Sequence, residues 1–314
     1  MITLYRYTLP FVRPVAIRTE RIGLLVRDGD TWGEAAPWPG LSRESLDEAE
    51  AELQAWRSNP AFAPQLSSVA FAVESVGRVS DPALTSKIPI NALLSDEPLD
   101  SALCAVREGG FRTLKIKVGR QSVRADAERV VEIHQQLAPA IKLRLDANRA
   151  WSFTDALDFA KRIAGVSLEH IEEPLREPAE LAAFHERTGL PLALDETLLE
   201  QPLENFRACR GLRAVVIKPM VVGGLRAAER LAAQATELGW LPVFSAVYES
   251  GVGIRTLARL AARCGAPSVA MGFDTYRCLA DDVLQPRLTI RDGRLDLAVA
   301  ERSQVCVEKL QELT

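Results

Sequence analysis

Apolar and polar positions follow one pattern near the start of the chain and another further along. Residues 2–9 and 21–27 alternate in the manner of β-strands, and the second run ends at the turn signal Asp28-Gly29-Asp30. Apolar residues then recur at helical spacing, first in a stretch capped by Ser42 and again over 67–79. The beginning of the chain therefore predicts an α+β unit, an antiparallel sheet followed by helices.

From Ile88 the pattern changes to short apolar strands that alternate with helical stretches. Eight candidate strands recur at regular intervals, which is typical of a (β/α)₈-type barrel. They cover 88–93, 113–118, 141–146, 167–171, 190–195, 214–218, 241–246 and 268–273. The alternative is an open doubly wound sheet. The barrel is preferred because polar side chains end many consecutive strands, whereas an open sheet concentrates its site at one switch point.

The tail from Asp281 contains two alternating strands about an Asp292-Gly293 turn. This hairpin is foreign to the barrel repeat, and we expect it to return to the N-terminal sheet. The predicted fold class is thus α/β, with a (β/α) barrel domain of residues 88–280. An α+β capping domain would be built from both chain ends, residues 1–87 and 281–314.

Length and composition exclude several classes of function. The 314 residues are 47% hydrophobic and 25% charged, which is enough for a large core and two domains. A net charge of −4 without a prominent basic run gives no reason to expect nucleic acid or a membrane surface as partner, and no obligatory protein partner is evident. The five cysteines lie far apart without a Cys-x-x-Cys pair, which argues against zinc or redox chemistry.

The start of the chain shows no targeting signal. Residues 1–7 lack a basic segment followed by an apolar one, and no run of about 18 apolar residues occurs. We therefore expect a cytoplasmic protein that acts on a small molecule.

Three acidic residues stand at the C-terminal ends of predicted strands: Asp146, Glu172 and Asp195. The carboxyl ends of barrel strands meet at one face, so these carboxylates should converge. Converging like charges repel strongly unless a cation neutralises them, and three hard oxygen ligands suit Mg²⁺. A structural network of ion pairs with nearby lysines is the alternative.

Lysines bracket these acids along the chain. Lys115 and Lys117 are two apart on one predicted strand, so both point to the barrel interior, and Lys218 ends the strand that follows the last acid. Crowding beside a second ammonium group and a divalent cation penalises the protonation of Lys117, as a general base requires. A structural role, bridging Asp146, suits Lys115 better.

The set Lys115-x-Lys117, Asp146-x-Asn148, Glu172, Asp195 and Lys218 resembles the enolase superfamily, in its muconate-lactonizing-enzyme subgroup, over nearly the whole chain. Within that subgroup, three segments of the chain resemble the o-succinylbenzoate synthases of the proteobacterial menaquinone pathway. These segments are 143–151, 213–219 and 32–34.

Carried over residue by residue, this resemblance implies roles for the acids and lysines. Asp146, Glu172 and Asp195 would bind Mg²⁺, which Mn²⁺ could replace. Lys117 would be the base, and Lys218 would be the cation opposite it.

The resemblance also implies roles for neighbouring residues. Lys115, Arg144 and Asn148 would orient the metal ligands and tune their charge. Ser245 and Gly272 match positions near the succinyl end of the substrate.

Segment 11–18, between the first two predicted strands, is rich in apolar and cationic residues. We expect a loop that closes as a lid over a bound anion, with Arg13 or Arg18 holding an anionic group of the substrate. An ordinary connector is an equally weighted alternative.

The implied reaction is the dehydration of 2-succinyl-6-hydroxy-2,4-cyclohexadiene-1-carboxylate to o-succinylbenzoate in menaquinone biosynthesis, catalysed by a carbon-oxygen lyase. A proton α to a carboxylate is removable only if the resulting negative charge is stabilised, and Mg²⁺ and Lys218 would supply positive charge there. Lys117 would take the proton and then assist departure of the hydroxyl on the same face, a syn dehydration.

Three other functions stay open. An N-succinylamino-acid racemase or dipeptide epimerase would use Lys117 and Lys218 on opposite faces, although dipeptide epimerases of this subgroup carry an Asp-x-Asp where this chain has Gly272-Phe273-Asp274. A Schiff-base aldolase could use interior lysines but does not need three convergent acids. A binding scaffold of the same fold should lack at least one ligand or lysine, and this chain has them all.

Overall fold

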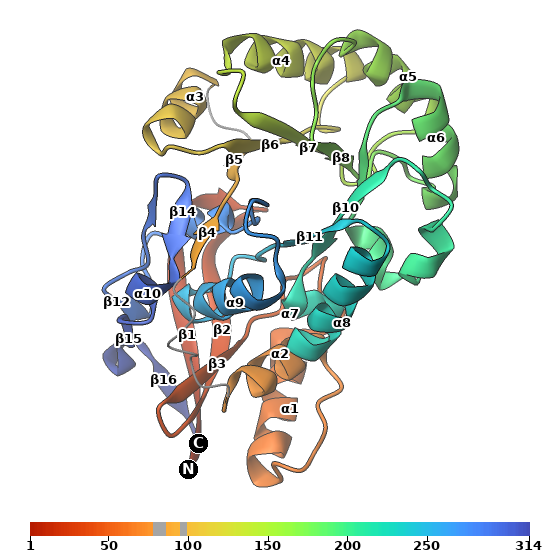
Figure 1. The fold of residues 1–314 in the computed structure, drawn as a ribbon. Helices are drawn as coiled ribbons and strands as arrows, with labels where there is room; N and C mark the ends of the chain where they lie inside the picture. Colours follow the sequence, from red (N-terminus) through yellow and green to blue (C-terminus); the bar gives the residue numbers. More distant parts are fainter. Residues whose placement is uncertain (78–85, 95–98) are drawn as a thin grey trace.

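The computed structural model describes residues 1–77, 86–94 and 99–314. Its N-terminal part is an antiparallel sheet with the strand order β16-β1-β2-β3. These strands span Ile2–Val15 (β1), Arg18–Asp28 (β2), Thr31–Ala35 (β3) and Gln311–Leu313 (β16). Because β16 pairs with β1, the two chain ends lie together (Figure 1). The last residues of the chain complete the sheet with which it begins.

The two faces of this sheet pack against different layers. Leu4 and Leu24 are buried in a small cluster with residues of two helices, and Tyr5 and Leu25, next to them in sequence, belong to the large core that continues through the barrel. This is the period-two alternation that the sequence showed. The two helices span Leu46–Ser58 (α1) and Ser67–Ser75 (α2).

The cap of α1 differs from the prediction. Ser45, not Ser42, is the N-cap: its hydroxyl accepts from the backbone N–H of Glu48, and the Glu48 carboxylate accepts from the N–H of Ser45 at 2.8 Å. The Ser42 hydroxyl instead accepts from the N–H of Trp38. The second predicted helix, 67–79, ends earlier, at Ser75. Its predicted end, 78 and 79, lies outside the described residues.

Parallel strands curl into the predicted barrel (Figure 1). Their order is β11-β10-β9-β8-β7-β6-β5, which is sequence order throughout. They span Ala92–Leu94 (β5), Thr113–Lys117 (β6), Lys142–Asp146 (β7), His170–Glu172 (β8), Leu192–Leu194 (β9), Leu212–Ile217 (β10) and Leu241–Phe244 (β11). The fold class expected from the sequence is confirmed.

A short segment closes the ring where an eighth strand was predicted over 268–273. The N–H of Met271 donates to the carbonyl of Pro89 at 2.8 Å, and the N–H of Gly272 donates to the carbonyl of Phe244 at 2.9 Å. The segment forms isolated bridges and not a full strand. The first residues of the predicted range belong to a turn, in which the N–H of Val269 donates to the carbonyl of Ala266.

Helices cover the outside of the barrel and connect successive strands (Figure 1). They span Leu99–Glu108 (α3), Val123–Gln136 (α4), Phe153–Arg162 (α5), Leu181–Thr188 (α6), Pro219–Val222 (α7), Gly224–Glu237 (α8) and Gly251–Cys264 (α9). Serine hydroxyls cap α4, α5 and α9 at Ser122, Ser152 and Ser250. The loops that follow β6, β7 and β11 therefore each lead into a helix with a capped N-terminus.

The C-terminal hairpin forms as predicted, but its partner differs. Strands Ile290–Arg291 (β13) and Arg294–Asp296 (β14) pair about the Asp292-Gly293 turn, and β14 then pairs with Lys87–Pro89 (β4). The expectation that this hairpin joins the N-terminal sheet is wrong. The register sets the buried side chain of Leu295 opposite that of Ile88, so apolar packing accounts for the pairing.

Three further short elements lie near the C-terminus. They are Leu284–Gln285 (β12), Leu297–Ala300 (α10) and Gln304–Val305 (β15). The boundaries drawn from the sequence between a capping domain and a barrel domain stay a prediction.

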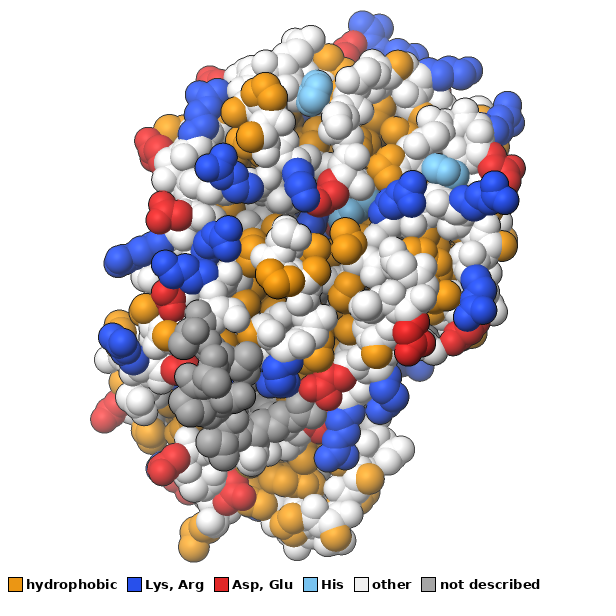
Figure 2. Space-filling view, viewed as in Figure 1, with side chains coloured by type: hydrophobic (Ala, Val, Ile, Leu, Met, Phe, Trp, Pro, Cys, Tyr) orange, Lys and Arg blue, Asp and Glu red, His pale blue; other side chains and the backbone are white. Residues whose placement is uncertain are grey.

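The surface shown in Figure 2 carries both signs of charge. Lys and Arg side chains alternate with Asp and Glu over the described part of this face. Among residues 1–77, 86–94 and 99–314, none of the helices has the length and apolar character needed to span a lipid bilayer.

Candidate active site

Three carboxylates meet at the C-terminal ends of adjacent barrel strands. Asp146 ends β7, Glu172 ends β8 and Asp195 directly follows β9. One oxygen of each lies within 4.8 Å of the others, and all three residues are buried. We call these residues the acid cluster. The structure thus brings together the three side chains that the sequence placed at strand ends.

Two lysines of β6 reach the acid cluster. Lys115 Nζ lies 2.8 Å from Asp146 Oδ2 and 2.6 Å from Glu172 Oε2. Lys117 Nζ lies 2.6 Å from the same oxygen of Asp146 and donates to Asn148 Oδ1 at 2.8 Å. Both side chains point inward because the residues are two apart on a strand.

Lys218 contacts the acid cluster from the other side. It follows β10, and its Nζ lies 2.5 Å from Asp195 Oδ2. In the sheet order the three strands that carry the acids lie between β10 and β6, so Lys218 and Lys117 flank the acids. Burial lowers the pKa of Lys218, but the charges of Asp195 and Glu196 and the hydrogen bond to Asp195 together raise it above its usual value.

Nearby ammonium groups favour the ionised forms of Asp146 and Glu172. Burial raises the pKa of Asp146, but Lys115 and Lys117 outweigh it and hold this pKa well below its usual range. Burial also raises the pKa of Glu172, but Lys115 and His170 together lower it below its usual value. Ionised oxygen donors on rigid strand ends are the ligand set of a hard divalent cation. The chemistry of the acid cluster therefore fits Mg²⁺.

Asp146 of the acid cluster lines a cavity of about 300 Å³. Predicted site residues that line it are Lys115, Lys117, Asp146, Asn148, Lys218, Ser245 and Gly272. Ser245 and Gly272 form a β-bridge, and a Cβ at position 272 would lie only 2.6 Å from Ser245 Oγ. Glycine at 272 thus permits the close approach of the two segments beside the lysines.

The N-terminal part of the chain covers the cavity. Four of its residues, which we call the roof, line the cavity: Trp38, Pro39, Gly40 and Leu41. The Trp38 ring stacks on Tyr248 with centroids 4.7 Å apart. The buried Arg21 donates to the carbonyls of Pro37 and Tyr248, each at 3.0 Å. Arg21 therefore connects the segment that leads into the roof with the loop after β11. The sequence did not predict this contact, because the two segments are far apart in the chain.

Arg144 lies away from the acid cluster. Its buried side chain points into the barrel, where Nε lies 2.6 Å from Glu169 Oε2 and Nη1 donates to the carbonyl of Ala270 at 2.8 Å. These contacts join β7 to the segments before β8 and at the barrel closure.

Arg13 and Arg18 are exposed at the tip of the hairpin formed by β1 and β2, outside the residues that line the cavity. The prediction that 11–18 is a loop is wrong. Ala16 and Ile17 adopt positive φ values of 46° and 66°, which close a two-residue turn between paired strands.

Glu173, adjacent to the acid cluster, turns away from it. Its Oε1 accepts from the N–H groups of Asp195 at 2.8 Å and Thr197 at 2.9 Å, and its Oε2 lies 3.2 Å from Arg149 Nε. Glu173 therefore fixes the backbone that carries Asp195. Of this adjacent pair the resemblance assigned only Glu172 to the metal, and it gave Glu173 no role.

Glu196 also lies beside the acid cluster. It lines the cavity, and its Oε1 accepts from Asn148 Nδ2 at 2.7 Å. Burial, followed by the charge of Asp195, raises the pKa of Glu196 to about 7.

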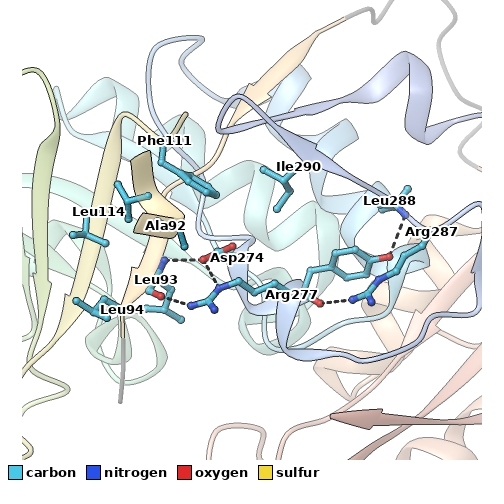
Figure 3. Close-up of a pocket in the computed structure, with 13 residues that line it drawn as sticks. Ala92, Leu93, Leu94, Phe111, Leu114, Asp274, Arg277, Arg287, Leu288 and Ile290 are labelled. Carbon is cyan, nitrogen blue, oxygen red and sulfur yellow. Dashed lines mark hydrogen bonds and ion pairs between the residues drawn. The ribbon is translucent and has the colours of Figure 1, made fainter. Parts of the chain in front are cut away.

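Asp274 separates the cavity from a second one of about 570 Å³ between β5, α3 and the 3₁₀-helix Asp274–Cys278 (Figure 3). Its Oδ2 accepts from the N–H of Leu93 at 2.8 Å and lies 2.9 Å from Arg277 Nε. Arg277 also donates to the carbonyl of Leu93. The charge of Asp274 is thus balanced by an arginine, and its carboxylate joins this helix to β5.

Family models match both parts of the chain. Residues 99–301 match the model described as "Enolase C-terminal domain-like", and residues 1–78 match the model "MenC, N-terminal domain".

Solved structures share the fold. The L-Ala-D/L-Glu epimerase from Bacillus subtilis has a TM-score of 0.79 at 23% identity, covering 97% of this chain and 96% of that one. MenC from Desulfotalea psychrophila LSv54 has a TM-score of 0.79 at 22% identity, covering 94% of this chain and 99% of that one.

Curated relatives are more similar in sequence. An o-succinylbenzoate synthase from Yersinia pseudotuberculosis serotype O:1b is 34% identical over 306 residues, covering 90% of this chain and 93% of that protein. An o-succinylbenzoate synthase from Yersinia pestis has the same identity and coverage. The chain therefore belongs to the enolase superfamily and, within it, to the o-succinylbenzoate synthase family.

Proposed function

We propose that this protein is an o-succinylbenzoate synthase, a lyase of menaquinone biosynthesis that dehydrates 2-succinyl-6-hydroxy-2,4-cyclohexadiene-1-carboxylate. Membership of the family gives the substrate. The observation that supports the chemistry is the pair Lys117 and Lys218, which flank three buried carboxylates and line the same cavity.

Asp146, Glu172 and Asp195 would hold Mg²⁺, the metal named with one solved structure of the fold, an enolase superfamily member from Roseovarius nubinhibens. When bound, Mg²⁺ supplies positive charge beside the substrate carboxylate, where negative charge develops as the α-proton leaves. Mn²⁺ would serve as a substitute.

Lys117 is the general base. It lines the cavity, and its Nζ is held by Asp146 and Asn148. Once it has taken the proton, the ammonium group on the same face can return a proton to the departing hydroxyl, which leaves as water. Loss of the hydroxyl makes the ring aromatic and so drives this second step.

Lys218 remains charged through both steps. Its raised pKa and its pairing with Asp195 keep it protonated on the opposite side of the substrate. A fixed cation there stabilises the negative charge that develops on the carboxylate. Ser245 and Gly272 contact the succinyl end, and Arg13 or Arg18 would reach an anionic group only if the hairpin moved toward the cavity.

The second candidate is an N-succinylamino-acid racemase. The arrangement that favours it is the same pair of lysines, because each could serve one face of a substrate carbon. A dipeptide epimerase is less favoured, because the carboxylate of Asp274 in the cavity wall is already paired with Arg277 and so offers little to an ammonium group.

The test is a substrate panel with Mg²⁺ present. The purified protein is incubated separately with the cyclohexadiene substrate, N-succinylamino acids and dipeptides, and products are identified by chromatography and optical rotation. We expect rapid formation of o-succinylbenzoate. Racemisation of an N-succinylamino acid at a higher kcat/KM than the dehydration would instead establish the second candidate.

A further inference from the structure

We infer that Glu196 is a positioning residue for Lys117, acting through the side-chain amide of Asn148. The inference rests on the proposed function, in which Lys117 is the base. It assigns to Glu196 the task of keeping the lone pair of the neutral lysine directed into the cavity.

A continuous chain of hydrogen bonds carries this inference. Glu196 Oε1 accepts from Asn148 Nδ2 at 2.7 Å, and Asn148 Oδ1 accepts from Lys117 Nζ at 2.8 Å. The backbone of Asn148 is itself fixed, because its N–H donates to Asp146 Oδ1 at 3.2 Å and its φ is 44°. The three residues line the same cavity.

Glu196 decides which way the amide of Asn148 faces. Asn148 is exposed within the cavity, so packing does not hold its side chain, and its hydrogen bonds must do so. A carboxylate accepts hydrogen bonds, which turns the amide nitrogen toward Glu196 and leaves the amide oxygen facing Lys117. The reverse orientation would set an N–H of Asn148 against the N–H groups of the lysine.

The orientation of this amide matters for proton transfer. A neutral amine has two N–H bonds and one lone pair. Asp146 Oδ2, 2.6 Å from Nζ, and Asn148 Oδ1 accept from the two N–H bonds, so the lone pair is left to point elsewhere, toward the cavity. If the amide turned, one N–H would lose its acceptor and Nζ could rotate the lone pair away from the substrate.

The hydrogen bonds of Glu196 do not suggest a purely structural role. Its second oxygen, Oε2, is buried yet has no hydrogen-bond partner among the described residues. Such an oxygen is costly. A glutamate kept only for packing would have both oxygens satisfied, as Glu173 has nearby.

The experiment compares Glu196→Ala with Glu196→Gln and with a matched control, Glu204→Ala. Glu204 makes the same kind of contact, a carboxylate that accepts from the amide of Gln234 at 2.5 Å, away from the cavity. In Glu196→Ala we expect kcat to fall roughly 10- to 100-fold with KM and Mg²⁺ affinity unchanged. The primary isotope effect on kcat for substrate deuterated α to the carboxylate should rise. Glu196→Gln, whose carbonyl can accept the same bond, should recover most of kcat, and Glu204→Ala should match wild type.

A wild-type kcat in Glu196→Ala, or a fall in Mg²⁺ affinity that accounts for the lost activity, would overturn the inference. Crystal structures of the two alanine variants keep the test independent of activity. The contact between Asn148 Oδ1 and Lys117 Nζ should be lost in Glu196→Ala only, and its persistence there would refute the positioning role. Failure of wild type to form o-succinylbenzoate would instead refute the proposed function.

Discussion

Two groups of buried carboxylates have different kinds of partners. In the acid cluster, Asp146 and Asp195 each contact at least one lysine. The second group, which we call the interface carboxylates, is Glu34, Glu249 and Asp282. Glu34 and Asp282 accept from hydroxyls and from backbone N–H groups at the start of α9, and Glu249 accepts from the N–H of Val247, which precedes α9.

The Glu34 carboxylate shows this difference clearly. It is fully buried and accepts from the Tyr7 hydroxyl at 2.5 Å, the Ser250 hydroxyl at 2.7 Å, the N–H of Ser250 at 2.9 Å and the N–H of Gly253 at 2.8 Å. It therefore caps α9 from the N-terminal sheet, where the helix dipole favours negative charge. Burial alone does not distinguish a cation site from such a structural contact; the charge of the partners does.

The largest effect should follow removal of divalent cations. If the acid cluster is the metal site, exhaustive chelation should reduce dehydration to the uncatalysed rate, and added Mg²⁺ should restore it. The interface carboxylates need no cation, so the melting temperature should change little. Full turnover after chelation would contradict the assignment of the acid cluster.

The next largest effect should separate the two lysines. Lys117→Arg should lower kcat by about 10²- to 10⁴-fold, because a guanidinium cannot act as a base near neutral pH. Lys218→Arg keeps the positive charge and should retain measurable activity. Comparable rates for the two variants would mean that the acid-base group lies elsewhere in the cavity.

Glu34→Ala should affect stability more than chemistry. It leaves four donors without their acceptor, which should lower the free energy of unfolding by about 4 kcal/mol, at roughly 1 kcal/mol for each donor. Urea denaturation measures this loss, with Glu20→Ala, at an exposed position of β2, as the control. A loss no larger than that of the control would mean that Glu34 does not hold α9 to the sheet.

The smallest predicted effect is a change in the free energy of unfolding with pH. Burial, and then the charge of Glu34, raises the pKa of Glu249 to about 7 from its usual 4.5. An acid with a raised pKa in the folded state stabilises the fold fully at low pH, and this contribution is lost as pH rises through 7. Relative to Glu249→Gln, which does not titrate, wild type should lose up to about 3 kcal/mol between pH 5 and pH 8. Urea denaturation at both pH values would show this, and parallel behaviour of the two proteins would contradict it.

Local patterns predicted much of this molecule. Asp146 and Glu172 end strands whose apolar residues recur at barrel spacing, so their convergence followed from the fold class. Lys115 and Lys117 share one face because strand periodicity is two. The positions of these residues follow from the strands to which they belong.

Contacts between segments that are far apart in the chain could not be predicted from the sequence. The pairing of β14 with β4, the stacking of Trp38 on Tyr248 and the hydrogen bond from Asn148 to Glu196 each join residues that no local pattern relates. The turn at Ala16 and Ile17 was missed for another reason, because residues other than glycine adopt the left-handed conformation there.

Calorimetric titration with Mg²⁺ tests the contrast between the two groups of carboxylates most directly. Wild type, Asp195→Asn and Glu249→Gln are titrated under the same conditions, after their melting temperatures show that each is folded. We predict one site in wild type and in Glu249→Gln and strongly weakened binding in Asp195→Asn. Binding that survives Asp195→Asn but is lost in Glu249→Gln would show that the cation site lies among the interface carboxylates.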